Sequence, residues 1–334
     1  IYTKEEGDDR MSDNKQSHWI PESELPPPEG AAAPPLTSDA SIQAALGVFE
    51  QHMRDEGFSI NTIKAFASDI RLLGKYLGIG QAIGEIGQNN LEDFLKWLLY
   101  ERGVPCSNKS YARRVTTLKV FFGWLQEANV LPINPAAGVV QISVRSPLPV
   151  VPSERQLAQA EAVAQAIRRG DGGKKPDARP YLLLSLLLQT GIKKGEAMTM
   201  VPNHIDHTDP QEPMLFVRYA NPRWRYKERK LPLQPEWLEV LDEYLAQYRP
   251  TDTLFTCTAH NLEYILTDMG KEAGLEQGLL SFENLRWASA LRDWHAKVEP
   301  DDIRQKLGLS KITWRETKSK LEKLAKKQED GVEA

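Results

Sequence analysis

The sequence predicts a mainly α-helical protein with a small β-sheet, divided into two domains. A chain of 334 residues is longer than one ordinary core and suits about two domains. Hydrophobic residues make up 41% of the chain and charged residues 26%, which is typical of globular proteins that fold in water. Apolar residues return every three or four positions along most of the chain, as in amphipathic helices, and two short strand-like segments interrupt this pattern.

The first 40 residues predict a flexible arm. They hold nine acidic residues against three basic ones, a net charge of −6, and they include prolines at 26–28 and 34–35. So few apolar side chains cannot compensate the entropy lost on ordering. The residues before Met11 are compatible with expression-tag or upstream sequence. A net charge of −4 for the whole chain would by itself disfavour a nucleic-acid partner. Residues 41–334, however, sum to +2, so the charge does not exclude such a partner.

Several classes of protein are disfavoured. The N-terminus lacks the apolar stretch of a signal peptide, and the longest apolar run, 181–188, is too short to cross a bilayer. The sequence therefore predicts no membrane partner and a cytoplasmic, nucleoid-associated location. Cys106 and Cys257 lie far apart and outside any metal-ligand spacing, so neither a disulfide framework nor a metal or cofactor is expected.

The first domain, 41–145, is predicted to contain helices at 41–56, 60–77, 89–102 and 107–128. One side of the last helix is apolar, with Val115, Leu118, Phe122 and Leu125. The opposite side is basic and hydroxylic, with Lys109, Arg113, Thr116 and Thr117. No acidic residue occurs between positions 104 and 126. An ordinary solvated face mixes both signs of charge, so this face favours contact with phosphates.

The second domain, 150–327, follows a linker marked by five prolines between positions 132 and 152. Helices are predicted at 153–169 and 180–190, on either side of a Gly- and Lys-rich loop at 170–176. A strand pair is predicted near 214–219 and 229–233. Further helices are predicted at 235–248, 260–273, 282–297, 300–307 and 311–327, and 328–334 is a tail.

The segment between the two strands is strongly basic. Residues 218–230 carry six Lys and Arg side chains against a single acid, Glu228, with Trp224 and Tyr226 interleaved. Cations next to aromatic rings offer both charge and stacking surfaces, so this segment is interpreted as a hairpin that enters DNA. The alternative is an ordinary solvated hairpin.

Five groups of short strings, in order, resemble the Xer and phage-integrase type of tyrosine recombinase. In the first domain they are FSINTIKAF at 58–66 and SYARR at 110–114, followed by FGWL at 122–125 and NP at 134–135. In the second domain they are TGIKKGE at 190–196, KERKLPL at 227–233, and NLR at 284–286 followed by LG at 307–308. The resemblance implies a helical SAM-like core-binding domain followed by a domain with the recombinase catalytic fold.

The resemblance also implies a catalytic site from which this chain departs. The family's two arginines correspond to Lys193 and Arg286, and its histidine positions to Glu283 and Leu309. Its nucleophilic tyrosine corresponds to Lys318, and no tyrosine follows Tyr264. Lysine keeps the charge of arginine but not its planar fork. These differences predict a degenerate member with no catalytic residues, which binds DNA without being an enzyme.

The preferred function is therefore clamping of duplex DNA in an architectural, regulatory or mobile-element accessory role. The expected DNA contacts are Lys64, Lys109, Arg113, Arg114, Thr117, Lys193, Arg223, Arg225, Lys227, Arg229 and Arg286. The competing interpretation of Arg286 is a structural ion pair with Glu283. Two alternative functions are a protein-interaction scaffold, and an active recombinase using another nucleophile such as Ser310 or Thr313. As in the resembled family, the Lys-rich closing helix is a candidate for self-association, and a DNA-facing helix is the competing interpretation.

Overall fold

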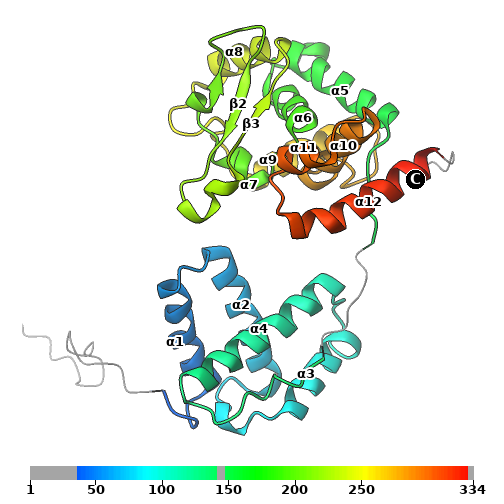
Figure 1. Ribbon diagram of the computed structural model, residues 1–334. Helices are drawn as coiled ribbons and strands as arrows, with labels where there is room; N and C mark the ends of the chain where they lie inside the picture. Colours follow the sequence, from blue (N-terminus) through cyan, green and yellow to red (C-terminus); the bar gives the residue numbers. More distant parts are fainter. Residues whose placement is uncertain (1–35, 141–146, 330–334) are drawn as a thin grey trace, which may run out of the picture. The chain divides into compact units, whose positions relative to one another are not determined.

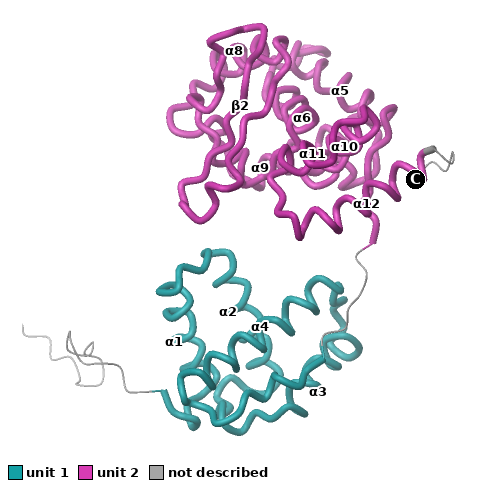
Figure 2. The backbone as a smooth tube through the Cα atoms, viewed as in Figure 1, with its two compact units in different colours: residues 1–146 teal, residues 147–334 magenta. Residues whose placement is uncertain are grey.

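The chain forms two compact units, described by a computed structural model for residues 36–140 and 147–329. Unit 1 covers residues 1–146 and unit 2 covers residues 147–334 (Figure 2). Most of the predicted acidic arm, part of the Pro-rich linker and the last residues of the tail lie outside the described ranges. Each unit has a hydrophobic core of its own.

Between residues 36 and 140, the regular elements of unit 1 are helices (Figure 1). Its α-helices are α1 (Ile42–Asp55), α2 (Ile60–Leu77), α3 (Gln88–Tyr100) and α4 (Asn108–Glu127). Three of them begin after a serine, Ser41, Ser59 or Ser107, whose hydroxyl accepts a backbone N–H of the first turn. These caps satisfy donors that have no partner within the helix. The predicted apolar side of α4 is buried in the core of this unit.

Unit 2 is built around helix α6 (Arg179–Thr190), most of whose leucines are buried. The helices that pack against α6 are α5 (Glu154–Arg169), α8 (Glu236–Tyr248), α9 (Ala259–Glu272) and α10 (Phe282–His295). A largely apolar helix of this kind suits a position that is covered on most sides. The remaining helices are α7 (Lys194–Met198), α11 (Pro300–Lys306) and α12 (Lys311–Glu329).

A three-stranded antiparallel sheet lies at one side of unit 2, with the order β1 (Ile205–Asp206), β2 (Met214–Val217) and β3 (Arg229–Pro232). Leu215 pairs with both Ile205 and Leu231, and all three face the core. The mainly helical class with a small sheet is thereby confirmed. Strand β1 and helix α7 were not predicted, because two and five residues are too short to show a period.

Helix α12 packs along α10 and α11 (Figure 1). Its apolar side chains Trp314, Leu321 and Leu324 are buried in a small cluster with Leu291 and Leu307. The apolar side of α12, a candidate for docking on a neighbouring subunit, is thus covered by the same chain. Within residues 36–140 and 147–329, no helix has the length and apolar character that a membrane span requires.

Candidate nucleic-acid interface

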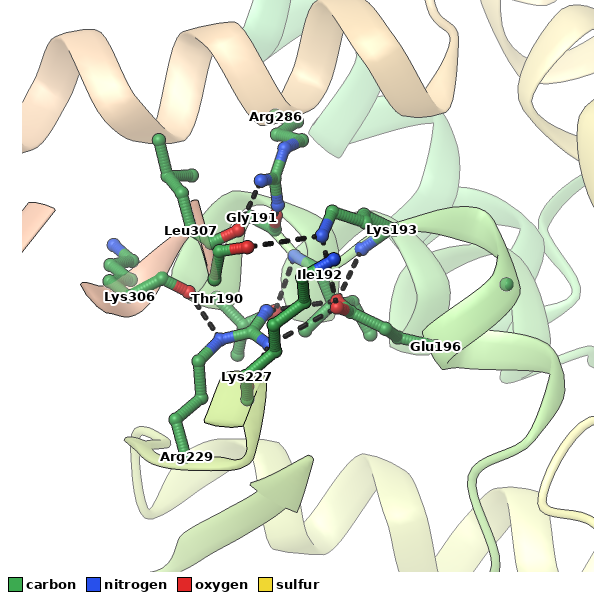
Figure 3. A network of polar contacts seen from close by, with 12 residues as sticks. Thr190, Gly191, Ile192, Lys193, Glu196, Lys227, Arg229, Arg286, Lys306 and Leu307 are labelled. Atoms are coloured by element: carbon green, nitrogen blue, oxygen red, sulfur yellow. Dashed lines mark hydrogen bonds and ion pairs between the residues drawn. The ribbon is translucent and has the colours of Figure 1, made fainter. Parts of the chain in front are cut away.

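Three cations and one carboxylate meet where the loop after α6 approaches β3, α10 and the end of α11 (Figure 3). Glu196 is the centre of this group and its side chain is only 3% exposed. One of its oxygens accepts the backbone N–H of Lys193 at 2.8 Å, which caps α7. The side chains of Lys193, Arg229 and Arg286 supply the positive charge. We call these four residues the cation cluster.

Arg229 is fully engaged inside the cation cluster. Its two terminal nitrogens lie 2.9 and 3.1 Å from the Glu196 carboxylate oxygens, and its Nε donates to the Lys306 carbonyl at 2.6 Å. The side chain is 8% exposed. Burial alone would raise the pKa of Glu196, but the hydrogen bonds and charge of Arg229 lower it to about 2. The expected phosphate contact by Arg229 is therefore wrong for this structure, since its donors already hold Glu196.

Arg286 is held by two backbone carbonyls, those of Gly191 and Leu307. In the described residues it forms no ion pair with Glu283, so the structural-pair interpretation is wrong. Burial lowers the pKa of Arg286 to about 10, which leaves it charged at neutral pH. Two of its five N–H donors are used on these carbonyls. A cation fixed on carbonyls keeps its charge available to an anion.

Lys193 is held less tightly in the cation cluster than Arg229. Its Nζ lies 3.3 Å from the Gly308 carbonyl oxygen and 3.6 Å from Glu196 Oε1, and its side chain is 38% exposed. Burial lowers the pKa of Lys193, with Arg286 and Arg229 adding to the effect, while Glu196 opposes it. A lysine surrounded by other cations gains from binding an anion, because the anion offsets that repulsion.

Two glycines allow this close approach. Gly191 has φ +57°, and a Cβ there would lie 3.1 Å from the Leu307 side chain. Gly308 has φ +56°, and a Cβ there would lie 2.7 Å from Arg229 Nη1. Positive φ and lack of space both favour glycine at these positions. The TG and LG strings thus have a physical role in bringing the loop and the end of α11 together.

A pocket of about 410 Å³ opens beside the cation cluster. It is lined by Lys193, Lys194, Glu263, Phe282, Glu283, Arg286, Trp287, Ala290, Leu307, Leu309 and Thr317. We call it the α10–α12 pocket. Five positions of this chain correspond to catalytic positions of the resembled family. Four of them line the pocket: Lys193, Glu283, Arg286 and Leu309. The fifth, Lys318, does not; it lies 3.9 Å from Glu322, and its neighbour Thr317 lines the pocket instead.

The basic segment between β2 and β3 points outward. Residues Pro222–Lys227 form a 3-10 helix, capped by the side chain of Asn221. Arg223 and Arg225 are exposed and form no ion pair with any other described residue. Trp224 is 41% exposed and Tyr226 is 69% exposed. Lys227 Nζ lies 4.0 Å from the Trp224 ring centroid and 5.2 Å from that of Tyr226. We call residues 222–227 the basic turn.

The basic face predicted on α4 is partly turned inward. Asp69 of α2, 3% exposed, accepts two hydrogen bonds from Arg113, at 2.8 and 2.9 Å, and one from the Thr117 hydroxyl at 3.0 Å. Arg114 Nε lies 3.5 Å from the same carboxylate. Thr117 is completely buried, so the expected contact between Thr117 and phosphate is wrong for this structure. Arg114 is 12% exposed, whereas Arg113 keeps 43% of its side chain exposed.

Asp69 is the residue that the sequence interpretation missed. It lies between Ala67 and Ile70 on the buried side of α2, and an acid on an apolar face is the signal that would have found it. The two remaining expected contacts of unit 1, Lys64 and Lys109, are exposed. Lys109 stands in the first turn of α4, and Lys64 in the first turns of α2. These two cations are not tied to Asp69 and remain available to an anion.

Comparison with known proteins finds similar sequences. Residues 48–129 match the phage integrase N-terminal SAM-like domain. The chain is 23% identical over 237 residues to tyrosine recombinase XerD of Listeria monocytogenes, covering 67% of this chain and 75% of that protein. It is 27% identical over 209 residues to XerD of Pseudomonas putida, covering 60% and 65%.

Solved structures share the fold. A lambda integrase dimer bound to a COC′ core site superposes with a TM-score of 0.63 at 17% identity, covering 86% of this chain and 81% of that one. XerH recombinase in a post-cleavage complex with palindromic difH substrate gives a TM-score of 0.64 at 17% identity, covering 85% and 83%. At such identities the likeness shows the fold alone.

One expectation is corrected by these relatives. The departures from the family pattern predicted a protein that is not an enzyme, but the relatives are named tyrosine recombinases, which are enzymes. The order of the recognised strings, the two-unit fold and the matched SAM-like domain all agree with the predicted resemblance. This chain is similar in sequence and in fold to the phage-integrase type of tyrosine recombinase.

Proposed function

We propose that this protein binds duplex DNA and acts in DNA recombination. The basic turn carries the proposal, because it exposes two cations that have no carboxylate partner among the described residues, next to two exposed aromatic rings. Phosphates are bound by unpaired cations, and each phosphate contact releases counterions from the DNA. A DNA-bound protein of this kind would be found with the nucleoid.

The cation cluster and unit 1 supply the remaining contacts. Lys193 and Arg286 line the α10–α12 pocket and keep donors that the protein does not use. Lys64 and Lys109 are exposed on unit 1, and Arg113, although its fork pairs with Asp69, keeps 43% of its side chain exposed. Relatives with this fold support the proposal, since a lambda integrase and XerH have been solved on DNA sites.

The test is duplex binding by the full chain as a function of salt. Replacing Arg223 and Arg225 by glutamine should lower the slope of log K against log salt by about 1.8, from about 0.9 for each lost phosphate contact. Replacing Lys175 and Lys271, which lie outside the basic turn and the pocket, removes the same charge and should leave the slope unchanged. Equal slopes for both double variants, or affinity indifferent to salt, would instead support the scaffold function.

A second candidate function is strand cleavage by this chain, and the position of Thr317 favours it. Ser310 caps α12 through its hydroxyl and Thr313 is exposed beside it, and neither lines the α10–α12 pocket. Thr317 does line the pocket, together with Lys193 and Arg286. Its hydroxyl donates to the Thr313 carbonyl at 3.1 Å. Of these three residues, Thr317 is the one that lines the pocket with the cations.

The cleavage step would be a simple displacement at phosphorus. Thr317 Oγ1 would form a bond to phosphorus while one phosphate–oxygen ester bond of the strand breaks. The threonine proton would pass to solvent, and the leaving oxygen would take a proton from the Lys193 ammonium, whose pKa is lowered by burial. Lys193 and Arg286 would stabilise the charge that develops on the phosphate oxygens.

Nicked suicide duplexes test this chemistry on denaturing gels. We expect a covalent protein–DNA adduct with the unmodified chain and none with Thr317→Val. Thr313→Val, which removes an exposed hydroxyl one turn away on the same helix, should retain the adduct. An adduct that survives Thr317→Val, or no adduct with the unmodified chain, would contradict the assignment of Thr317.

A further inference from the structure

We propose that the α10–α12 pocket binds one unstacked deoxynucleotide of the DNA, with its phosphate on Lys193 and Arg286 and its base against Trp287. The inference rests on the proposed DNA binding, because the nucleotide is part of a bound strand. It goes further by naming a distorted or unpaired nucleotide, rather than a stacked one, as the feature that this pocket accepts.

The pocket lining combines two kinds of side chain. Lys193, Lys194 and Arg286 are cationic, whereas Phe282, Trp287, Ala290, Leu307 and Leu309 are apolar. Its volume of about 410 Å³ falls in the range of roughly 300–1,000 Å³ that holds small molecules. A phosphate by itself would use only the cations. The additional apolar lining fits a ligand with a flat ring next to its anion, which describes a nucleotide.

The cations that line the pocket have unused donors. Lys193 Nζ reaches one carbonyl and, at 3.6 Å, one carboxylate, and Arg286 gives two of its five N–H groups to carbonyls. Lys194 is less available, because it pairs with Glu263 at 3.0 Å. Lys193 and Arg286 are therefore the two groups that would hold the phosphate.

The two carboxylates in the pocket lining narrow the choice of base. Glu263 is paired with Lys194, whereas Glu283 is exposed and forms no ion pair within the described residues. A free carboxylate repels a bare phosphate but accepts hydrogen bonds from an exocyclic amino group, as carboxylates do from cytosine N4. Glu283 therefore favours a base that carries an amino group, such as cytosine, over thymine.

Calorimetric titration of the full chain with 2′-deoxycytidine 5′-monophosphate tests the site. The nucleotide should bind at least about tenfold more tightly than inorganic phosphate or deoxycytidine alone, since stacking and phosphate contact are both needed. It should also bind more tightly than thymidine 5′-monophosphate. Equal affinity for the nucleotide and for inorganic phosphate would overturn the proposal, because the apolar lining would then contribute nothing.

Substitutions on α10 distinguish a loss of base stacking from a general loss of helix packing. Trp287→Ala should weaken nucleotide binding by about tenfold, and Trp287→Phe, which keeps a ring, should retain most of it. Trp294→Ala is the matched control, because Trp294 is half-buried on the same helix, packs on the same cluster as Trp287 and does not line the pocket. Glu283→Gln changes an exposed side chain and should reduce the preference for cytosine. Equal losses for Trp287→Ala and Trp294→Ala, with Trp287→Phe no better, would contradict the stacking role.

A parallel duplex-binding measurement keeps the two proposals distinct. If duplex DNA binds in a salt-dependent way while the nucleotide does not, the inference fails and the proposed function stands. If the nucleotide binds through Trp287 but duplex DNA does not bind, the proposed function fails, and with it the assignment of the nucleotide to a DNA strand.

Discussion

Helix α4 of unit 1 and the basic turn of unit 2 are both rich in arginine, but their side chains are used in opposite ways. On α4 the Arg113 fork and the Thr117 hydroxyl close onto the buried carboxylate of Asp69. In the basic turn Arg223 and Arg225 remain exposed. The difference depends on a carboxylate contributed by another segment. Local charge identifies a candidate surface, and a distant acid decides whether that surface faces solvent.

The largest expected effect comes from removing the carboxylate that holds Arg229 inside unit 2. Glu196→Gln leaves the buried Arg229 without its charged partner, and we expect a loss of about 3–5 kcal/mol in the free energy of unfolding. Urea unfolding measures it. Glu283→Gln, an exposed carboxylate of the same unit, should change stability by less than about 0.5 kcal/mol. A small effect of Glu196→Gln would mean that Arg229 is free to leave the cluster.

The same carboxylate should make stability depend on pH. The pKa of Glu196 is about 2 in the folded chain, below its ordinary value of 4.5. The stabilisation is therefore fully present above about pH 4.5 and is lost as pH falls toward 2, by roughly 3 kcal/mol at about 1.4 kcal/mol per pH unit. Urea unfolding between pH 6 and pH 3 measures the slope. Glu196→Gln should flatten it, and an unchanged slope in that variant would assign the titration elsewhere.

Removing the acid in unit 1 should have a smaller effect on stability. Asp69→Asn breaks the pair with Arg113, but that guanidinium is 43% exposed and regains water, so we expect a loss of about 2 kcal/mol. Asp93→Asn, an exposed acid of the same unit paired with Lys96, is the control and should be nearly neutral. In the folded Asp69 variant Arg113 is released, so DNA affinity should become more dependent on salt.

The smallest expected effect distinguishes two neighbouring cations of α4. Lys109→Gln should leave unfolding unchanged and lower the salt slope of DNA binding by about 0.9, the value for one phosphate contact. Arg114→Gln should do the reverse, because Arg114 is 12% exposed beside Asp69. Filter binding at several salt concentrations, with urea unfolding of each variant, measures both. If the two variants change stability and DNA binding alike, the proposed difference between a structural Arg114 and a DNA-binding Lys109 is wrong.

Much of the architecture could be predicted from residue patterns. The long helices of both units begin and end within two residues of their predicted positions, because apolar periodicity and serine caps are local signals. The Gly191 and Gly308 strings were recognised as family motifs, and the structure adds the reason: both have positive φ and little space for a Cβ. The short elements α7 and β1 were missed, since they depend on their tertiary neighbours.

The site was predicted less completely, because side-chain partners are a long-range property. Arg229 is held by Glu196, 33 residues away, and Arg113 by Asp69, 44 residues away. No spacing rule links such positions before the chain folds. Thr317 was overlooked in the same way, since only the packing of α12 against α10 brings this residue to the pocket.

The sequence by itself determined the mainly helical class, the order of the long helices, the basic character of residues 218–230 and the family resemblance. Each of these depends on neighbours within a few positions, where helix geometry and turn chemistry act directly. Only the tertiary structure decided which cations are available. A buried carboxylate requires a charged partner and takes the nearest arginine in space, so Arg113 and Arg229 turned inward while Arg223, Arg225 and Lys109 stayed outside.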